Sequence, residues 1–390
     1  MANDLCTETG YVSYNKAGEE LCGDKLEVYQ DEKITLMVLA DGLGSGVKAN
    51  ILSTLTSKIL VTMIAGGMPI DECIDTIAST LPVCKVRGVA YSTFTVIVIR
   101  EMRHAELIQY DNPAIIMLRG GARWDYPVST RSVAGKTIHE SKFPVREGDL
   151  LIAMSDGAPF AGVGVTRNFG WQRENIIDFA EANYLPENSA KHTAAVIGEA
   201  CNQLYEYRPG DDTTVAALRI RKRSAVNLVI GPPADKAQDV KMMNLFFAKD
   251  GEKVVCGGTT ASIAAKYLGR EIEPTLDYPD PDIPPVSCIA GVDLVTEGVI
   301  TISRVLQIGE AILGGGAAQT AWTHQSDGAS QVARKLFDEA TDINFFVGRA
   351  INPAHQNPDL PITFGIKIQL IEALEKCLAK MGKRIKVSYF

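Results

Sequence analysis

Several aspartates of this 390-residue chain stand beside a glycine where a predicted strand begins or ends. The acidic positions that share this local design are Asp24, Asp41, Asp156, Asp211 and Asp212. Strand ends of one sandwich converge at an edge, so we expect these carboxylates to gather in one cleft. Carboxylates gathered without cations repel one another and raise each other's pKa. Mg²⁺ or Mn²⁺ would suit such an all-oxygen site.

Two such ions a few ångströms apart can activate a bridging water and hold a phosphoryl group for in-line attack. This chemistry needs no serine, cysteine or histidine nucleophile. The alternative interpretation is that the aspartates only cap turns, and the residues alone leave it open.

The clearest case is the apolar run 37–40, which reads as a buried strand and ends at Asp41. Gly42, Gly44 and Gly46 follow, and glycine lets the backbone turn sharply. Apolar residues then recur at helical spacing up to Ala65. A carboxylate between a strand end and a helix N-terminus suits a hard cation or a phosphate.

The elements that must position these residues are mostly strands in the first half of the chain. We expect strands at 10–14, 25–29, 34–39, 92–100, 105–109, 115–118, 150–154 and 215–220. We expect helices at 48–65, 70–81, 173–183 and 189–205.

The run Arg221–Arg223 reads as a domain edge, which divides the chain into residues 1–222 and 223–390. Strands and helices then alternate, which predicts a smaller α/β domain with a mainly parallel sheet. The expected strands are 226–230, 253–256, 343–347 and 384–389, and the expected helices include 235–249, 302–313, 330–340 and 365–381. Gly257, Gly258, Thr259 and Thr260 open a further helix, either as a plain turn or as an anion site in a ligand-binding or regulatory domain.

Composition excludes several classes of protein. The net charge of −8 and the lack of a long basic run argue against a nucleic-acid partner. The eight cysteines form no C-x-x-C motif, which favours reduced thiols in a cytoplasmic protein. Neither a signal peptide nor a continuous apolar stretch of membrane-spanning length is evident, so we expect no membrane partner.

The order of the motifs in residues 8–222 resembles the SpoIIE-type (stage II sporulation protein E) branch of the metal-dependent PPM protein serine/threonine phosphatases. The matching elements are Gly23-Asp24, Asp41-Gly42-Leu43-Gly44-Ser45-Gly46, Ser92-Thr93-Phe94-Thr95, Asp111-Asn112-Pro113, Ser155-Asp156-Gly157 and Asp211-Asp212-Thr213-Thr214. This resemblance implies an α+β fold: an α-β-β-α sandwich with the metal cleft at one edge.

By the same resemblance, Asp24 would bridge two Mn²⁺ or Mg²⁺ ions, and Asp41 would bind or bridge them beside the Gly42 carbonyl. Asp156 and Asp211 would hold the other metal, and Asp212 could assist or replace Asp211. Metal-bound hydroxide, held by Asp24 and Asp41, would attack phosphoserine or phosphothreonine directly. Relatives act on anti-sigma-factor antagonists in bacterial signalling and are thought to switch their metal site through the helices at 48–81.

The chain departs from the family pattern at three points. The phosphate-binding arginine of eukaryotic relatives is missing, and Lys16 and Lys25 are the nearest cations. No acidic residue follows Ser155-Asp156-Gly157 closely, and Cys22 places a thiol beside Asp24. None of these departures removes an implied metal ligand.

Two alternatives to a phosphatase stay open. One is a non-catalytic signalling or scaffold module that keeps the fold. The other is a protein that binds a phosphorylated small molecule through the second domain. The sequence does not fix the oligomeric state, and a homodimer is one alternative.

Overall fold

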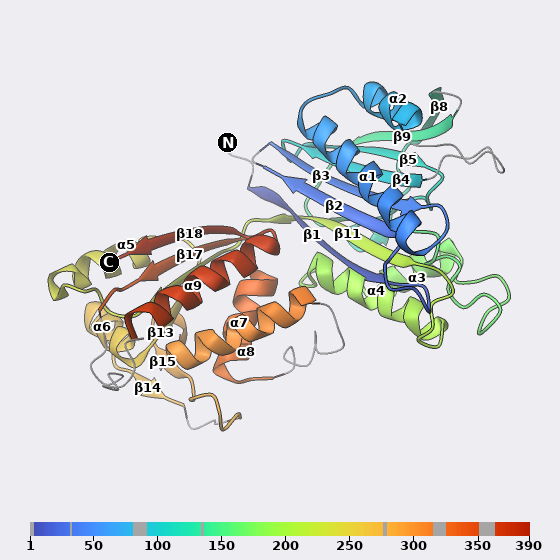
Figure 1. Ribbon diagram of the computed structural model, residues 1–390. Helices are drawn as coiled ribbons and strands as arrows, with labels where there is room; N and C mark the ends of the chain where they lie inside the picture. Colours follow the sequence, from blue (N-terminus) through green and yellow to red (C-terminus); the bar gives the residue numbers. More distant parts are fainter. Residues whose placement is uncertain are drawn as a thin grey trace. The chain divides into compact units, whose positions relative to one another are not determined.

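The computed structural model describes residues 4–31, 33–80, 92–133, 136–275, 279–314, 325–350 and 363–390. The chain forms two compact units, Met1–Lys222 (unit 1) and Arg223–Phe390 (unit 2) (Figure 1).

Unit 1 contains two antiparallel sheets. Sheet A has the strand order β1-β11-β10-β6-β7, formed by β1 (Leu5–Tyr14), β6 (Ile116–Arg119), β7 (Ala122–Arg123), β10 (Asp149–Met154) and β11 (Thr213–Lys222). Sheet B has the order β2-β3-β4-β5-β9-β8, formed by β2 (Asp24–Gln30), β3 (Ile34–Gly42), β4 (Ser92–Arg100), β5 (His104–Tyr110), β8 (Ser129–Val133) and β9 (Lys136–Pro144).

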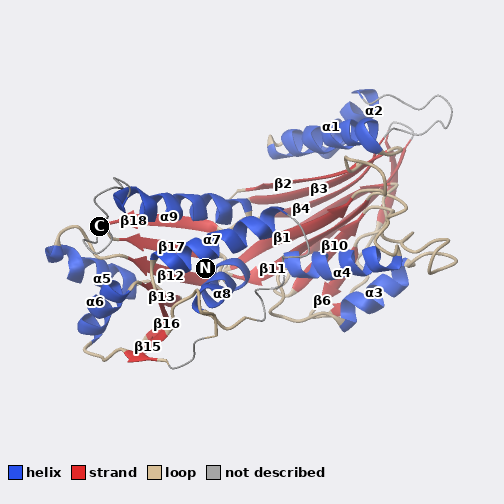
Figure 2. Cartoon of the chain, turned by 60° about the horizontal axis from the view of Figure 1, so that its bottom comes forward, coloured by secondary structure: helices blue, strands red, loops and turns tan. Residues whose placement is uncertain are grey.

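Helices cover the outer faces of both sheets, which gives four layers (Figure 2). The helices α1 (Gly46–Ala65) and α2 (Ile70–Thr80) pack on sheet B, and α3 (Arg173–Ala182) and α4 (Ala190–Leu204) pack on sheet A. Successive side chains of a strand point to opposite faces of the sheet, so one strand contributes both to the core under the helices and to the core between the sheets. In β3, Leu36 and Val38 face the helices, whereas Met37 and Leu39 face the other sheet. The predicted α-β-β-α sandwich is confirmed.

The helix α1 is long and apolar enough to cross a membrane by length and composition alone, the single such helix within the described ranges. In the structure its side chains Leu60 and Ile64 are buried in the core cluster that also contains Leu36 and Val38 of sheet B. The helix is thus a packed layer of the sandwich.

Unit 2 contains one sheet with the order β14-β15-β16-β13-β12-β17-β18. Its strands are β12 (Ala225–Ile230), β13 (Glu252–Cys256), β14 (Glu273–Pro274), β15 (Ser287–Ile289), β16 (Val292–Thr296), β17 (Asp342–Val347) and β18 (Arg384–Tyr389). The five strands from β16 to β18 in this order are parallel, and β14 and β15 extend the edge in antiparallel fashion. The mainly parallel sheet that the sequence predicts is therefore confirmed.

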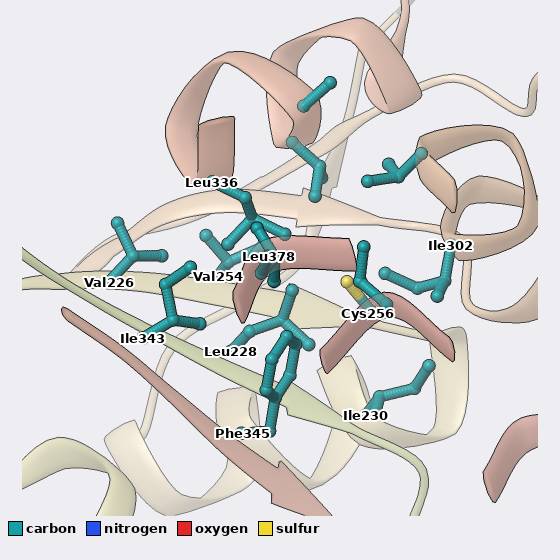
Figure 3. Close-up of a cluster of buried hydrophobic side chains, with 14 of the residues drawn as sticks. Val226, Leu228, Ile230, Val254, Cys256, Ile302, Leu336, Ile343, Phe345 and Leu378 are labelled. Atoms are coloured by element: carbon teal, nitrogen blue, oxygen red, sulfur yellow. The ribbon is translucent and has the colours of Figure 1, made fainter. Parts of the chain in front are cut away.

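Both faces of this sheet are covered. The helices α7 (Val299–Gly314), α8 (Gly328–Ala333) and α9 (Thr363–Lys380) share one core cluster with Leu228 and Ile230 of β12 (Figure 3). The helices α5 (Asp239–Phe247) and α6 (Gly258–Leu268) pack with Val229 on the opposite face. A strand buried on both faces is apolar along most of its length, which explains why β12 was predictable.

Several elements differ from the sequence-based expectations. The hairpin β8–β9 and the strands β7, β14, β15 and β16 were not predicted, and β1 begins at Leu5 rather than at Gly10. The expected helix at 235–249 is split into a 3₁₀ turn (Lys236–Gln238) and α5, and the helix expected at 330–340 changes from α8 to a π-helical segment, Arg334–Glu339. Leu81, the expected end of α2, lies outside the described residues.

Candidate active site

Asp24 and Asp41 lie side by side at one end of sheet B. Asp24 begins β2, Asp41 is the penultimate residue of β3, and the two are direct partners in the antiparallel register. Opposite residues on neighbouring strands bring their side chains to the same face, and like charges in that arrangement are destabilising. The fold therefore holds two carboxylates together at a cost in free energy.

Sheet A contributes the remaining aspartates. Asp156 follows the end of β10, and Asp211 and Asp212 precede β11. Because β10 and β11 are antiparallel neighbours with Met154 opposite Val215, the end of one strand and the start of the other meet. All five predicted acidic residues therefore come from strand ends, as the sequence indicated.

A serine hydroxyl joins the two sheets at this point. Ser155 Oγ donates a hydrogen bond to Asp24 Oδ2 over 2.7 Å and accepts one from the Thr214 backbone N–H over 2.9 Å. Ser155, Asp24 and Thr214 are all buried. The sequence placed Ser155 in a motif but gave it no role, because its partner is 131 residues away.

The carboxyl groups influence each other electrostatically. Burial raises the pKa of Asp41, and the negative charges of Asp24 and Asp156, followed by those of Asp211 and Asp212, raise it further. Burial is also the main cause of the raised pKa of Asp24, against the opposing effect of the Ser155 and Thr214 hydrogen bonds. The pKa of Asp156 is raised by burial and then by Asp211. The cluster is therefore more stable with protonated carboxyl groups or bound cations than with ionised carboxylates alone.

Two oxygen atoms in this cluster have no partner. Asp24 Oδ1 and Asp212 Oδ2 are buried and accept no hydrogen bond. Asp212 Oδ2 lies beside the backbone of Gly23, since a Cβ atom on that glycine would be 2.7 Å away. Buried carboxylate oxygens without donors are costly, and a divalent cation is the natural group to satisfy them.

The donor set fits Mg²⁺ or Mn²⁺ in chemistry, since every candidate ligand is an oxygen atom. Within the ranges that the structure describes, no three carboxylate, imidazole or thiol groups are close enough together to hold a metal ion. Water ligands or side-chain rotation would have to complete the coordination, as is common for cations that keep several waters. The metal-binding roles of Asp24, Asp41, Gly42, Asp156, Asp211 and Asp212 stay predictions.

Gly42 sets the contact between the site and α1. A Cβ atom at Gly42 would lie 2.1 Å from the carbonyl oxygen of Ala49, so only glycine fits against the first turns of the helix. Asn50 of α1 also donates a hydrogen bond from Nδ2 to the Cys22 carbonyl over 2.8 Å. The helix therefore contacts the chain at Cys22, two residues before Asp24, and at Gly42, directly after Asp41.

Of the two cations that the sequence singled out, Lys16 reaches the cluster. Its backbone N–H donates to Asp212 Oδ1 over 3.0 Å, and its Nζ lies 3.6 Å from Asp211 Oδ1. Lys25 instead lies 4.0 Å from Glu27. Burial and the charge of Asp24 strongly raise the pKa of Cys22, which keeps this thiol protonated and favours a packing role.

Comparison with curated proteins finds no match. Among solved structures, the phosphatase domain with a regulatory fragment of the cell fate determinant SpoIIE from Bacillus subtilis has 21% identity and a TM-score of 0.49, covering 56% of this chain and 64% of that one. The chain thus spans less than two thirds of that structure. A second SpoIIE phosphatase-domain structure from Bacillus subtilis has 20% identity and a TM-score of 0.44, covering 57% of this chain and 95% of that one.

The catalytic domain of the serine/threonine protein phosphatase PstP, in complex with two manganese ions, has 16% identity and a TM-score of 0.38, covering 56% of this chain and 100% of that one. The family model described as Stage II sporulation protein E (SpoIIE) matches residues 31–221 and ends one residue before unit 1 does. This match confirms the SpoIIE-type resemblance of unit 1 that the order of the motifs indicated.

Proposed function

We propose that unit 1 hydrolyses phosphoserine or phosphothreonine on a regulatory protein. The observation that carries this proposal is the convergence of Asp24 and Asp41 from sheet B with Asp156, Asp211 and Asp212 from sheet A. The match of residues 31–221 to the SpoIIE family model supports a protein phosphatase in general terms. The choice of serine and threonine esters, and the direct attack of water, belong to the proposal.

Two divalent cations, Mn²⁺ or Mg²⁺, are the proposed cofactors. Asp24, Asp41, Asp156 and Asp211 would hold them, with Asp212 and the Gly42 carbonyl as further ligands. When bound, such ions supply an activated water and neutralise charge that develops on the phosphoryl group.

The chain's own residues prepare this site. Ser155 occupies Asp24 Oδ2 and leaves Oδ1 without a partner, so the hydrogen bond fixes which oxygen is free to bind a cation. The Lys16 backbone does the same for Asp212 by occupying Oδ1. Held carboxylates need little reorganisation when a cation and a phosphoryl group arrive.

The deciding experiment is hydrolysis of p-nitrophenyl phosphate and of a phosphoserine peptide in the presence of Mn²⁺. Wild type should be active only with the metal, and Asp41→Asn should lose most of that activity. Asp125→Asn is the matched control, since Asp125 is an exposed carboxylate of the same unit that pairs with Arg123. An inert wild type with Mn²⁺, or an Asp41→Asn variant as active as wild type, would favour a non-catalytic signalling module.

The proposed substrate is a phosphorylated protein of the anti-sigma-factor-antagonist type, acting in the cytoplasm. The free thiols of the described cysteines are in keeping with a reducing compartment. Unit 2 would act as a regulatory or ligand-binding domain. Comparing the activity of full-length protein with that of a 1–222 fragment tests this role, and identical activity under all conditions would count against it.

A further inference from the structure

Two neighbouring strand-to-helix turns of unit 2 share one backbone design. β13 passes through Gly257 into α6, and β16 passes through Gly298 into α7. In each turn the glycine carbonyl accepts the first helical hydrogen bond, from Ala261 over 2.9 Å and from Ile302 over 3.1 Å. Because β13 and β16 are parallel, both helices begin at the carboxyl edge of the sheet, where ligands of open α/β sheets bind.

The two turns differ in what occupies the helix N-terminus. In α7, Glu297 Oε2 accepts hydrogen bonds from Ile300 N over 2.9 Å and from Thr301 N over 3.4 Å. This carboxylate is an anion that the chain itself supplies to the positive end of the helix dipole.

The N-terminus of α6 has no such group. Gly257 precedes the helix with φ +104°, and no side chain caps the first turn. Gly258 and Thr259 are exposed, and a Cβ atom at Gly258 would meet nothing within 4 Å. The backbone amides of Gly258 and Thr259 therefore belong to exposed residues and have no side-chain cap.

A buried hydroxyl points to the same place. Thr260 is 1% exposed, and its Oγ1 has no hydrogen-bond partner. This oxygen lies at the start of the helix, 3.4 Å from the position that a Cβ atom on Gly257 would take. A buried polar atom without a partner requires a reason, and a bound anion that accepts its hydrogen bond is one.

We propose that the N-terminus of α6 binds the phosphate group of a small ligand. The amides of Gly258 and Thr259 and the hydroxyl of Thr260 would donate to the phosphate oxygens, as helix N-termini do for anions. The carboxylate of Glu297, which would repel a phosphate, is nearby, but it already accepts a hydrogen bond from the first turn of α7. Free phosphate and a phosphorylated metabolite offer the same chemistry, so the test includes both.

The test is calorimetric titration of the full-length chain with inorganic phosphate, pyrophosphate and AMP. EDTA is present throughout, so that no metal-held phosphate binds at the acidic cluster of unit 1. Wild type should bind at least one of the three, and Thr260→Val should weaken that binding at least five-fold. Absence of heat from all three would overturn the proposal.

Thr301→Val is the matched control. Thr301 is equally buried, also has an unpartnered Oγ1, and holds the same position in the turn whose N-terminus Glu297 fills. It should bind the ligand as wild type does. If both valine variants bind like wild type, or both lose binding equally, the assignment to α6 is wrong.

The melting temperature adds a second readout. The bound ligand should raise the melting temperature of wild type and of Thr301→Val but not that of Thr260→Val. An equal rise in all three proteins would contradict a site at α6. Neither threonine belongs to the acidic cluster, so this result is independent of whether unit 1 proves to be a phosphatase.

Discussion

Ser155 Oγ lies 2.7 Å from Asp24 Oδ2 and thereby ties the end of a strand in one sheet to the start of a strand in the other. The same hydroxyl accepts from Thr214 N, so three segments meet at one buried oxygen. The position of Asp24 therefore depends on both sheets rather than on its own strand alone.

Replacing Ser155 by alanine should weaken both stability and function. The change leaves Asp24 Oδ2 and the Thr214 N–H buried without their partner, which costs about 1–3 kcal/mol. We expect urea unfolding to show a loss of this size, with reduced Mn²⁺ affinity in calorimetry. Ser13→Ala is the control, because the exposed Ser13 hydroxyl contacts Thr214 Oγ1 instead. Equal losses of stability and of Mn²⁺ affinity in the two variants would show that the Ser155 hydrogen bonds are not the cause.

The metal-free protein should become less stable as the pH rises. The folded pKa values of Asp24 and Asp41 are raised, mainly by burial. Their contribution to the free energy of unfolding is full below the unfolded pKa of about 4 and is lost as the pH rises through the folded values. Urea unfolding at pH 5 to 9 in EDTA measures this loss, and Mn²⁺ should restore stability at the alkaline end.

Asp41→Asn tests the cause of that pH dependence. The amide does not ionise, so the variant avoids the cost of protonating Asp41 on folding, and without metal it should be more stable than wild type at pH 8 by at least about 1 kcal/mol, the equivalent of one pKa unit. The same variant should lose Mn²⁺-dependent activity. A variant less stable than wild type at pH 8 would show that the raised pKa of Asp41 does not cause the loss of stability at high pH.

Lys16→Met should tighten the binding of Mn²⁺. Lys16 Nζ lies near Asp211 and offsets part of the negative charge that would attract the ion. Both side chains are partly exposed, and exposed pairs contribute about 0–1 kcal/mol, so the gain should be no more than roughly five-fold. Added salt should reduce this gain in Mn²⁺ affinity. Lys25→Met, which removes a partner of Glu27, should leave Mn²⁺ affinity unchanged.

Gly42→Ala should disrupt the junction between the site and α1. The new methyl group would lie 2.1 Å from the Ala49 carbonyl, so the helix must move. Overpacking of this kind typically costs about 1–3 kcal/mol, which thermal unfolding would detect. Gly66→Ala, at the other end of α1, has ordinary φ of −72° and a closest contact of 3.2 Å, and should be tolerated better.

The acidic residues could be found in the sequence because each lies within two residues of a glycine and beside an apolar strand. The sequence could not assign Ser155 a partner, since hydrogen bonds between distant segments leave no local pattern. It also offered Lys16 and Lys25 as equals, and only the fold shows that Lys16 contacts Asp211 and Asp212.

The missed elements have physical reasons as well. β9 alternates buried with exposed residues and carries several charged side chains, so its apolar signal is weak. β16 has only five residues and is defined by its pairing with β13. The π-helical turn at Arg334–Glu339 differs from an α-helix in hydrogen-bond register, which residue spacing does not reveal.

The hydrogen bonds of Ser155 also limit how early the acidic cluster can form during synthesis of the chain. A nascent chain emerges from its N-terminus, so Asp24 and Asp41 leave the ribosome long before Ser155 and Thr214. The site cannot assemble until β11, the last strand of unit 1, has been made. Translation of unit 2 begins directly afterwards, at Arg223. The acidic cluster therefore cannot be completed until synthesis of the second unit has begun.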